Sequence, residues 1–526
     1  MGFSPTDEGW ILADSRRLLA GQVPHRDFLK VQVPGTLVLH APEVFFGGDY
    51  TFWISRLVAW LQIAVIAWSW PLIFSKLTRK SLTLRQHAAL GLIGIAFTAN
   101  TFPVMVWPTF DGLFFISLGL LLALRPGTRS KLGGYFLIGL SYLCKQNFVF
   151  VFPAVLILLR DWKKLRYWTA AILPGILYLG ALFVLGALPA AIVQVGSAGG
   201  FVSRAIVPYL ASGELLLAIC AGMTAAALLC RRERAAALLG AVLTYLALLG
   251  CAAGLTTDLY RYARLVSFSL MGLCIGATLA RLLFKVNGRR AVIAGLVVIA
   301  VAWATSISNG FNYPTLAGGI LVLFLLQVVL ADIGSSFRTK YAIPAGLAVF
   351  TIVTLAAFSV GRYHHIYRDL PANMLTAKLD GVLPGGKLLR TNTNTYAFLS
   401  DLNLAISETH GARYAIVPGF AAYWVKGKQL NPLPIDWAHC LPSGDHSHAA
   451  IVACDVLPNP SMIDRLVKSV ADQKGSVVLL VQKVEPEHLR DGFAPLDESL
   501  YPAALLSYVR SHFVKVGETK YFELRR

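Results

Sequence analysis

Two adjacent carboxylates near the start of the chain, Asp7 and Glu8, are the residues best suited by type to do chemistry. They stand in the run Thr6-Asp-Glu-Gly-Trp10, and the charged runs Arg16-Arg17 and His25-Arg-Asp27 follow on the same segment. A carboxylate can act as a general base, and an arginine can hold an anionic group. This concentration of acidic, basic and aromatic groups suits an enzyme at a membrane surface better than an anchor or a transporter. The rest of the chain is then expected to position this segment.

The composition predicts a polytopic α-helical membrane protein. The 526 residues are 56% hydrophobic and 14% charged, with a mean hydropathy of +0.61, whereas soluble domains carry about 25% charged residues. A helix needs roughly 17–25 apolar residues to cross a hydrocarbon core of about 30 Å. Such runs predict twelve spans, near 52–74, 87–106, 109–125, 132–144, 146–160, 167–187, 213–230, 235–254, 262–284, 291–305, 314–331 and 342–361. The expected parts are therefore an exterior loop at 1–51, a multi-span domain at 52–361 and a C-terminal domain at 362–526.

The net charge of +19 is concentrated in alternate loops between these spans. Six loops carry nineteen lysines and arginines against only Asp161, Glu233 and Asp332. By the positive-inside rule these loops are cytoplasmic. Residues 1–51 and the C-terminal domain are then expected on the exterior, periplasmic face of the cytoplasmic (inner) membrane. Because topology accounts for the cations, no nucleic-acid partner is expected.

This topology requires residues 1–51 to be translocated to the exterior, although the sequence shows no signal peptide. An upstream first helix, which would raise the count to thirteen spans, is the favoured explanation. A protein whose short head is translocated by its first span is the alternative. Within the segment, apolar residues at helical spacing over Trp10–Leu19 predict an amphipathic helix, and a second one follows Pro34-Gly35. Both are expected to lie in the membrane interface.

The motifs of this segment resemble those of a known superfamily. Asp7-Glu8-Gly9 is followed by Arg16 or Arg17, by Gly21-Gln-Val-Pro-His-Arg-Asp-Phe28 and by Pro34-Gly35. This pattern is similar to the first exterior loop of GT-C membrane glycosyltransferases of the family 39 type, which includes protein O-mannosyltransferases and lipid A aminoarabinose transferases. The many spans and the exterior C-terminal domain are similar as well. The resemblance covers the membrane part, and its motifs identify a superfamily rather than a substrate.

The resemblance implies transfer of a sugar from a polyprenyl-phosphate donor to a glycan, lipid or protein acceptor outside the cytoplasmic membrane, with inversion. Asp7 would take the proton of the acceptor hydroxyl. Glu8 would orient Asp7 or bind the acceptor, and Arg16 and Asp27 would support the loop or the acceptor. The alternative interpretation is that Asp7 and Glu8 cap the helix that follows Gly9, because acidic residues favour a first turn. Neither a cofactor nor a metal is predicted, although Asp7, Glu8 and Asp111 could together hold a divalent ion.

Charged residues at the predicted exterior ends of the spans extend the candidate site. Asp111 matches a second acidic residue of the family approximately, with a helix cap as the alternative. Lys145 lies between two short spans, where its ammonium could hold the leaving phosphate or extend to the lipid headgroups. Arg261 and Arg264 suit a lipid phosphate equally, but beside Tyr260 and Tyr262 they also fit an ordinary interface belt.

The composition changes near Arg362, and the remaining residues predict a small soluble α/β domain. Strands are expected at 386–390, 412–417, 449–453 and 476–481, a helix at 460–473 and a hairpin at 512–525. Its expected role is acceptor recognition or shielding of the site. Cys440 and Cys454 fall in this exterior domain and predict a disulfide. The nearby histidines 439, 446 and 448 fit a solvated turn better than a metal site.

Two other function classes remain open. Twelve spans also suit a transporter or flippase of a lipid-linked or small-molecule substrate, although the sequence has no clear inverted repeat and no matched pair of broken helices. A polysaccharide ligase or polymerase would share the lipid-linked donor but would use a large central exterior loop. Loss of activity on Asp7→Ala favours the glycosyltransferase, whereas coupled flux in vesicles favours the transporter.

Overall fold

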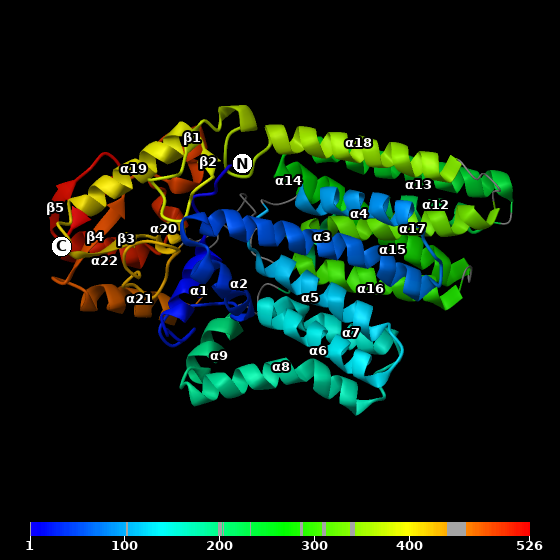
Figure 1. The fold of residues 1–526 in the computed structure, drawn as a ribbon, viewed down its shortest axis with the longest axis horizontal. Coiled ribbons are helices and arrows are strands. Elements are labelled where there is room, and N and C mark those ends of the chain that lie inside the picture. Colours follow the sequence, from blue (N-terminus) through cyan, green and yellow to red (C-terminus); the bar gives the residue numbers. More distant parts are fainter. Residues whose placement is uncertain are drawn as a thin grey trace.

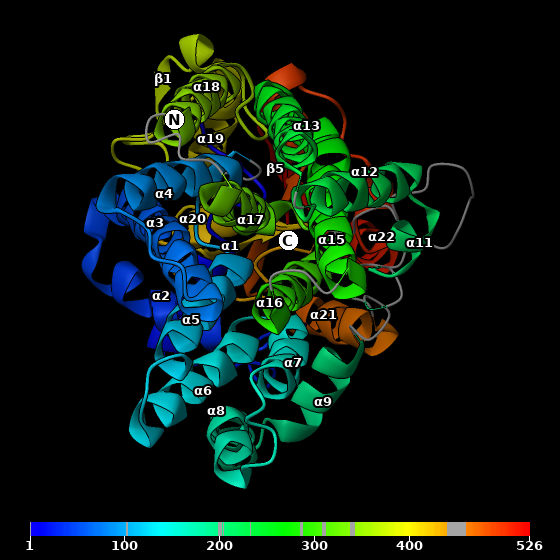
Figure 2. The same cartoon turned by 90° about the vertical axis from the view of Figure 1, so that its right-hand side faces the viewer.

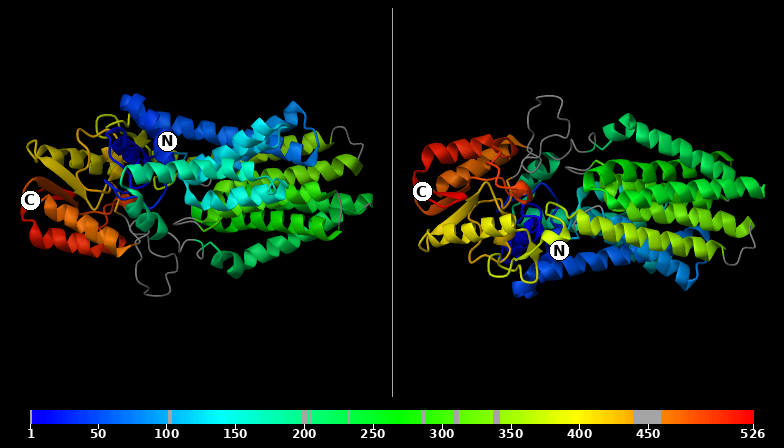
Figure 3. Two further views of the ribbon diagram at one scale, coloured as in Figure 1. Left: turned by 90° about the horizontal axis from the view of Figure 1, so that it is seen from below. Right: turned by 90° about the horizontal axis from the view of Figure 1, so that it is seen from above.

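The protein consists of a long helical bundle with a small sheet-containing domain at one end, and the N-terminal segment lies between them (Figure 1). The computed structural model describes residues 2–100, 104–197, 202, 205–231, 233–284, 288–307, 312–336, 342–438 and 459–526. Views from two further sides also place the N-terminal segment between bundle and sheet (Figure 3).

The bundle is built from apolar helices that run along the long axis of the molecule. These are α3 (Thr51–Thr78), α4 (Leu84–Ala99), α5 (Pro108–Ala123), α6 (Thr128–Cys144), α7 (Val151–Leu158), α8 (Leu165–Val184), α12 (Gly213–Leu229), α13 (Arg234–Ala253), α15 (Ser267–Phe284), α16 (Gly288–Ser306), α17 (Gly318–Ser336) and α18 (Ala342–His364). Each predicted span overlaps one of these helices, but the predicted span 87–106 runs beyond the end of α4 and the predicted span 146–160 contains, of these helices, only the short α7. Among the described residues, seven helical stretches are long and apolar enough to cross a membrane: Gly48–Thr78, Leu165–Val184, Arg234–Thr256, Leu259–Phe284, Arg289–Ser306, Thr315–Asp332 and Pro344–His364. The count of twelve stays a prediction, because several of the other helices are shorter than a span requires.

Exposure along the bundle separates central helices from lipid-facing ones. The stretch Thr315–Asp332 is 78% buried within the protein and Leu165–Val184 only 22%, and Figure 2 shows α17 near the centre and α8 at the edge. In α12 and α15 small residues let the two backbones touch, since a Cβ on Gly276 would lie 2.2 Å from the Ile219 carbonyl oxygen. Apolar side chains left exposed on α8 and α3 suit a hydrocarbon solvent, so the bundle is consistent with a membrane protein.

The C-terminal region holds a four-stranded sheet in the order β3-β4-β6-β5. Strands β3 (Arg413–Val417) and β4 (Val477–Gln482) are parallel, while β6 (Phe522–Arg525) is antiparallel to β4 and to β5 (Lys515–Glu518). Alternate residues of the buried strands face opposite sides, so α19 (Thr393–Ser407) covers one face, and α21 (Pro460–Asp472) and α22 (Ala503–His512) cover the other. The helix α21 and the hairpin agree with the sequence.

Two predicted strands of this domain have other outcomes. The 386–390 segment is a turn from which only Arg390 enters a strand, β2 (Arg390–Thr391), paired with β1 (Ala377–Lys378). The predicted strand was wrong here, because Leu388 adopts a left-handed backbone conformation with φ of 69°. The 449–453 segment lies outside the described residues.

The N-terminal helices α1 (Trp10–Leu19) and α2 (Gly35–Phe46) form where the sequence predicts them. Helix α1 was expected to place its apolar face in the membrane interface. Its apolar residues Ile11 and Leu12 instead share one core with α19, β3 and the short helix α20 (Ala421–Trp424). The helical spacing of apolar residues in the sequence predicts an apolar face on α1, but it does not indicate what packs against that face. Helix α2 does keep an apolar exposed side, with Phe45 66% and Phe46 80% exposed.

Candidate functional site

Asp7 lies in a polar site between the bundle and the C-terminal domain. Its Oδ2 accepts a hydrogen bond from the Tyr367 hydroxyl at 2.5 Å and lies 3.3 Å from the Arg368 guanidinium. Burial opposes the charge of Arg368, but the Asp7 carboxylate raises the pKa of that guanidinium. Both of these contacts fall on Oδ2. Asp7 itself is 4% exposed.

Glu8 points to the other side and joins the first long helix. Arg56 of α3 donates to both Glu8 carboxylate oxygens, at 2.6 and 2.5 Å, in a bidentate pair. A cavity of about 50 Å³ adjoins this pair, and Arg362 at the end of α18 and Tyr367 also line it. The side chain of Arg362 forms no ion pair or hydrogen bond with another described residue. The cavity is therefore lined by two guanidinium groups against one carboxylate.

Gly9 explains why the acidic pair can sit so close to the C-terminal domain. Its φ of 103° lies in the left-handed region, and a Cβ there would come 2.7 Å from the Cα of Ala422 in α20. Helix α1 starts directly after this residue, and no side chain caps it. Neither Asp7 nor Glu8 caps α1, so the alternative of a helix-capping pair does not describe their contacts.

The charges of this site balance when all its groups are counted. Arg368 also donates to Glu487 at 2.6 Å, so the acids Asp7, Glu8 and Glu487 face the arginines 56, 362 and 368. Arg368 further donates to the Thr6 hydroxyl. Because Arg368 lies between Asp7 and Glu487, the arginine of this group that has no acidic partner in the described part of the chain is Arg362, which lines the cavity.

A second buried cluster surrounds Asp111 in the first turn of α5. His40 of α2 lies between two carboxylates, with Nε2 3.0 Å from Asp111 Oδ1 and Nδ1 2.6 Å from Glu43 Oε1. Gln62 of α3 donates to the same Asp111 oxygen at 2.7 Å. Burial alone would lower the pKa of His40, but Asp111 and Glu43 raise it to about 10. His40 is thus an imidazolium that joins α2 to α5.

Lys145 is buried near this cluster, with 6% of its surface exposed. Its ammonium donates to the Thr109 hydroxyl of α5 at 3.1 Å, and burial lowers its pKa to about 7. Two aromatic residues connect the Asp7 segment with the start of α5. The ring centres of Trp10 in α1 and Trp107, which precedes α5, lie 6.1 Å apart. The predicted residues Asp7, Glu8, Asp111 and Lys145 therefore share one end of the bundle, but Asp111 and Asp7 have separate sets of contacts.

Four other predicted site residues lie elsewhere. Arg261 and Arg264 are exposed and pair with Asp258 and Glu214, so the structure does not bring them to Asp7. Arg16 donates to the Trp424 carbonyl, and Asp27 pairs with its neighbour Arg26 on the surface. Arg16 and Asp27 were assigned from the motif, and Arg261 and Arg264 from their position at a predicted exterior end of a span. Neither argument fixes which residues their side chains contact. Cys440 and Cys454 lie outside the described residues.

Sequence reasoning missed most of the groups that surround Asp7 and Glu8. Arg56 and Arg362 stand near the ends of apolar helices, and the cost of placing a charge there could have singled them out. Tyr367, Arg368 and Glu487 carry no local signal, because they reach Asp7 only through the packing of distant segments. Among the described residues, no three histidine, cysteine or acidic side chains are arranged to hold a metal ion.

Comparison with known proteins adds no relative to these observations. No family model matches the sequence, and neither a curated protein nor a solved structure gives a significant match.

Proposed function

We propose that this protein is an inverting membrane glycosyltransferase that uses a polyprenyl-phosphate sugar donor. The observation that carries the proposal is a cavity at one end of an apolar bundle. Glu8, Arg56, Arg362 and Tyr367 line it, and the Tyr367 hydroxyl donates to Asp7. A carboxylate beside a cationic cavity supplies both groups that this reaction needs, a base for the acceptor and a cradle for the phosphate. The resemblance of the Asp7-Glu8-Gly9 segment to family 39 enzymes supports the same reaction.

The chemical step uses Asp7 as the base. The acceptor hydroxyl oxygen attacks the anomeric carbon, the bond from that carbon to the phosphate oxygen breaks, and its electrons leave with polyprenyl phosphate. The hydroxyl proton passes to Asp7 Oδ1, while Tyr367 and Arg368 hold Oδ2. One attack from the face opposite the phosphate inverts the sugar carbon.

In this proposal the arginines of the cavity bind the donor phosphate, the role that the sequence analysis gave to Lys145, Arg261 and Arg264. Arg362, which has no acidic partner among the described residues, would pair with the donor phosphate, and Arg56 would share it from its place on Glu8. Glu8 then positions Arg56 rather than taking a proton. Lys145 is held by Thr109, and Arg261 and Arg264 by surface carboxylates, so the proposal no longer relies on them.

The test compares Asp7→Asn with wild type in membranes supplied with radiolabelled polyprenyl-phosphate sugars. Release of sugar from the carrier is expected to fall by about 10²–10⁴-fold, the usual contribution of a general base. Asp49→Asn is the matched control, because Asp49 is an exposed carboxylate of the same segment and should keep wild-type turnover.

Two results would contradict the proposal. Wild-type turnover in Asp7→Asn would remove Asp7 as the base. Absence of turnover with every donor in a folded preparation, together with coupled flux in vesicles, would instead favour the transporter class.

A further inference from the structure

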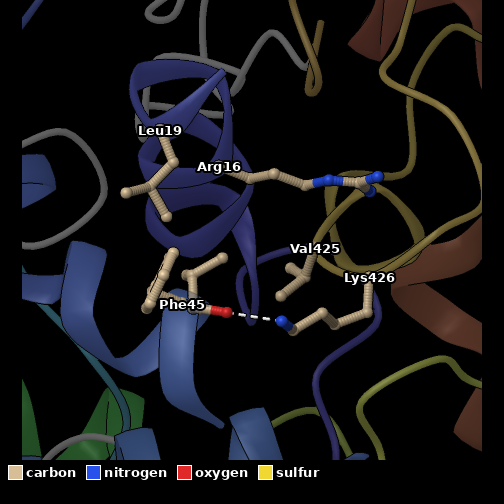
Figure 4. A pocket seen from close by; sticks show the side chains of 6 residues that line it. Arg16, Leu19, Phe45, Val425 and Lys426 are labelled. Atoms are coloured by element: carbon tan, nitrogen blue, oxygen red, sulfur yellow. Dashed lines mark hydrogen bonds between the residues drawn. The ribbon is translucent and has the colours of Figure 1, made fainter. Parts of the chain in front are cut away.

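A surface groove that the proposed reaction does not use lies where α1, α2 and the residues after α20 meet. It has a volume of about 260 Å³. Arg16 and Leu19 of α1, Val44 and Phe45 of α2, and Val425 and Lys426 line it (Figure 4). The groove therefore combines two cations with an apolar floor, and none of the described residues that line it is acidic.

The two cations of the groove have only backbone partners. Arg16 donates to the Trp424 carbonyl at 2.7 Å, and Lys426 donates to the Val44 carbonyl. Neither forms an ion pair with a carboxylate in the described part of the chain. Burial lowers the pKa of Lys426, and the nearby Arg16 lowers it further against the weaker effect of Asp49. An anion between Arg16 and Lys426 would relieve this repulsion.

The apolar floor of the groove continues into a face that suits lipid. Phe45 and Phe46 are exposed at the end of α2, and α3 follows with exposed side chains at helical spacing, Trp53, Leu57 and Leu61. Aromatic residues such as Tyr50 and Trp53 gather where a bilayer meets water. The junction of α2 and α3 therefore marks the level of the lipid headgroups.

A third cation lies at the same level. Lys387 places its ammonium 4.9 Å from the centre of the Tyr50 ring, which stands between α2 and α3. Cations directly above an apolar face match a lipid that carries an anionic headgroup and acyl chains. Free inorganic phosphate would match the charges but would leave Phe45 and Phe46 exposed to water.

We infer that this groove binds the anionic headgroup of a bilayer phospholipid. Arg16 and Lys426 hold its phosphate, and Leu19 and Phe45 contact the glycerol and the upper acyl chain. The site would fix α2 against the membrane surface. The inference is independent of the proposed reaction and holds for a transporter as well.

The test measures lipid retained by the purified protein after reconstitution with phosphatidylcholine and phosphatidylglycerol in equal amounts. Native mass spectrometry counts the bound molecules of each kind. Lys426→Gln is expected to lower retained phosphatidylglycerol about fivefold, the effect of one cation at a membrane surface. Lys428→Gln removes the same charge from an exposed residue outside the groove and should retain as much as wild type. Phe45→Ser, at an exposed position, tests the apolar floor and should also lower retention.

Three results would overturn the inference. One is equal retention of phosphatidylglycerol by wild type and Lys426→Gln, both with wild-type melting temperatures. Another is an equal loss in Lys428→Gln, which would indicate general surface charge. The third is binding of inorganic phosphate by lipid-free protein that Lys426→Gln abolishes and Phe45→Ser leaves intact, which would make the ligand a free anion.

Discussion

His40 shows how a single buried residue ties stability to pH. Its folded pKa of about 10 lies above the ordinary value of 6.5, because Asp111 and Glu43 outweigh burial. A raised pKa contributes stability that is complete below about 6.5 and is lost as the pH rises through 10. Lys145 works in the opposite direction, since its lowered pKa makes the fold gain stability with rising pH above about 7.

Replacing His40 should remove one of these two opposing effects. The change His40→Gln is expected to lower the apparent Tm in detergent at pH 6. The expected loss of stability is a few kcal/mol, because the His40 imidazolium loses its interaction with Asp111 and Glu43. The difference should shrink as the pH approaches 10 and disappear above it, where His40 becomes neutral in the folded state as well. A Tm difference that stays constant from pH 6 to pH 10 would show that His40 is not charged in the fold.

Gly9 gives a second test at the residue scale. Gly9→Ala places a Cβ against the Ala422 backbone at a left-handed φ, so we expect a loss of about 2–4 kcal/mol in stability. Gly21→Ala is the matched control, since Gly21 also has a positive φ of 81° but has open space around it. It should cost about 1 kcal/mol. Equal melting temperatures for the two variants would contradict the close approach.

At the scale of elements, α1 is held to the C-terminal domain by a buried ion pair. Arg17 Nε and Nη2 donate to the two carboxylate oxygens of Asp436, at 2.6 and 2.7 Å, and Nη2 also donates to the Leu433 carbonyl at 2.7 Å. Both side chains are 3% exposed. Breaking one partner of such a pair leaves an uncompensated charge in the interior.

Arg17→Met is therefore expected to cost about 3–5 kcal/mol and to loosen α1. A protease-sensitivity assay should show faster cleavage in residues 1–51, alongside a lower Tm. Arg26→Gln breaks a surface pair on the same segment and should cost no more than about 1 kcal/mol. Cleavage of Arg17→Met at the wild-type rate would mean that α1 is held by its apolar contacts alone.

Elements were more predictable than their contacts. The bounds of α1, β3, β4 and α21 follow from hydrophobic periodicity, which is local in sequence. Periodicity cannot say that the apolar face of α1 packs on α20 instead of lipid, since both partners present the same apolar surface. It also cannot place Arg261 outside and Arg56 inside, because that depends on which neighbours surround each helix.

For the whole molecule, the sequence makes a topological prediction. The connections between α3 and α4, α5 and α6, and α7 and α8 are basic, and they lie at the end of the bundle away from the C-terminal domain (Figures 1 and 3). A membrane-impermeant thiol reagent should label Ser511→Cys in α22 of intact cells and should label Ser81→Cys, between α3 and α4, only after permeabilisation. Wild type gives the background from native cysteines. The reverse labelling would place the candidate site on the cytoplasmic side.

The site as a whole could not be derived from the sequence, because it exists only in the assembled molecule. Asp7 and Glu8 were recognisable from their motif, whereas Tyr367 and Arg368 reach them across about 360 positions of chain. A local pattern contains no information on such pairings. The same distance separates Phe3 from Asp369, which accepts its backbone N–H and also binds Thr391 and Asn392.

This separation has a consequence for biosynthesis. Arg17 and its partner Asp436 are 419 residues apart, and a ribosome adds about 5–20 residues each second. After α1 has been made, roughly 20–80 s pass before its partner is synthesised. Throughout that interval the charged guanidinium of Arg17 and the apolar face of α1 lack the surface that buries them. The N-terminal segment therefore gains this contact only after residue 436 has been synthesised, late in the production of the chain.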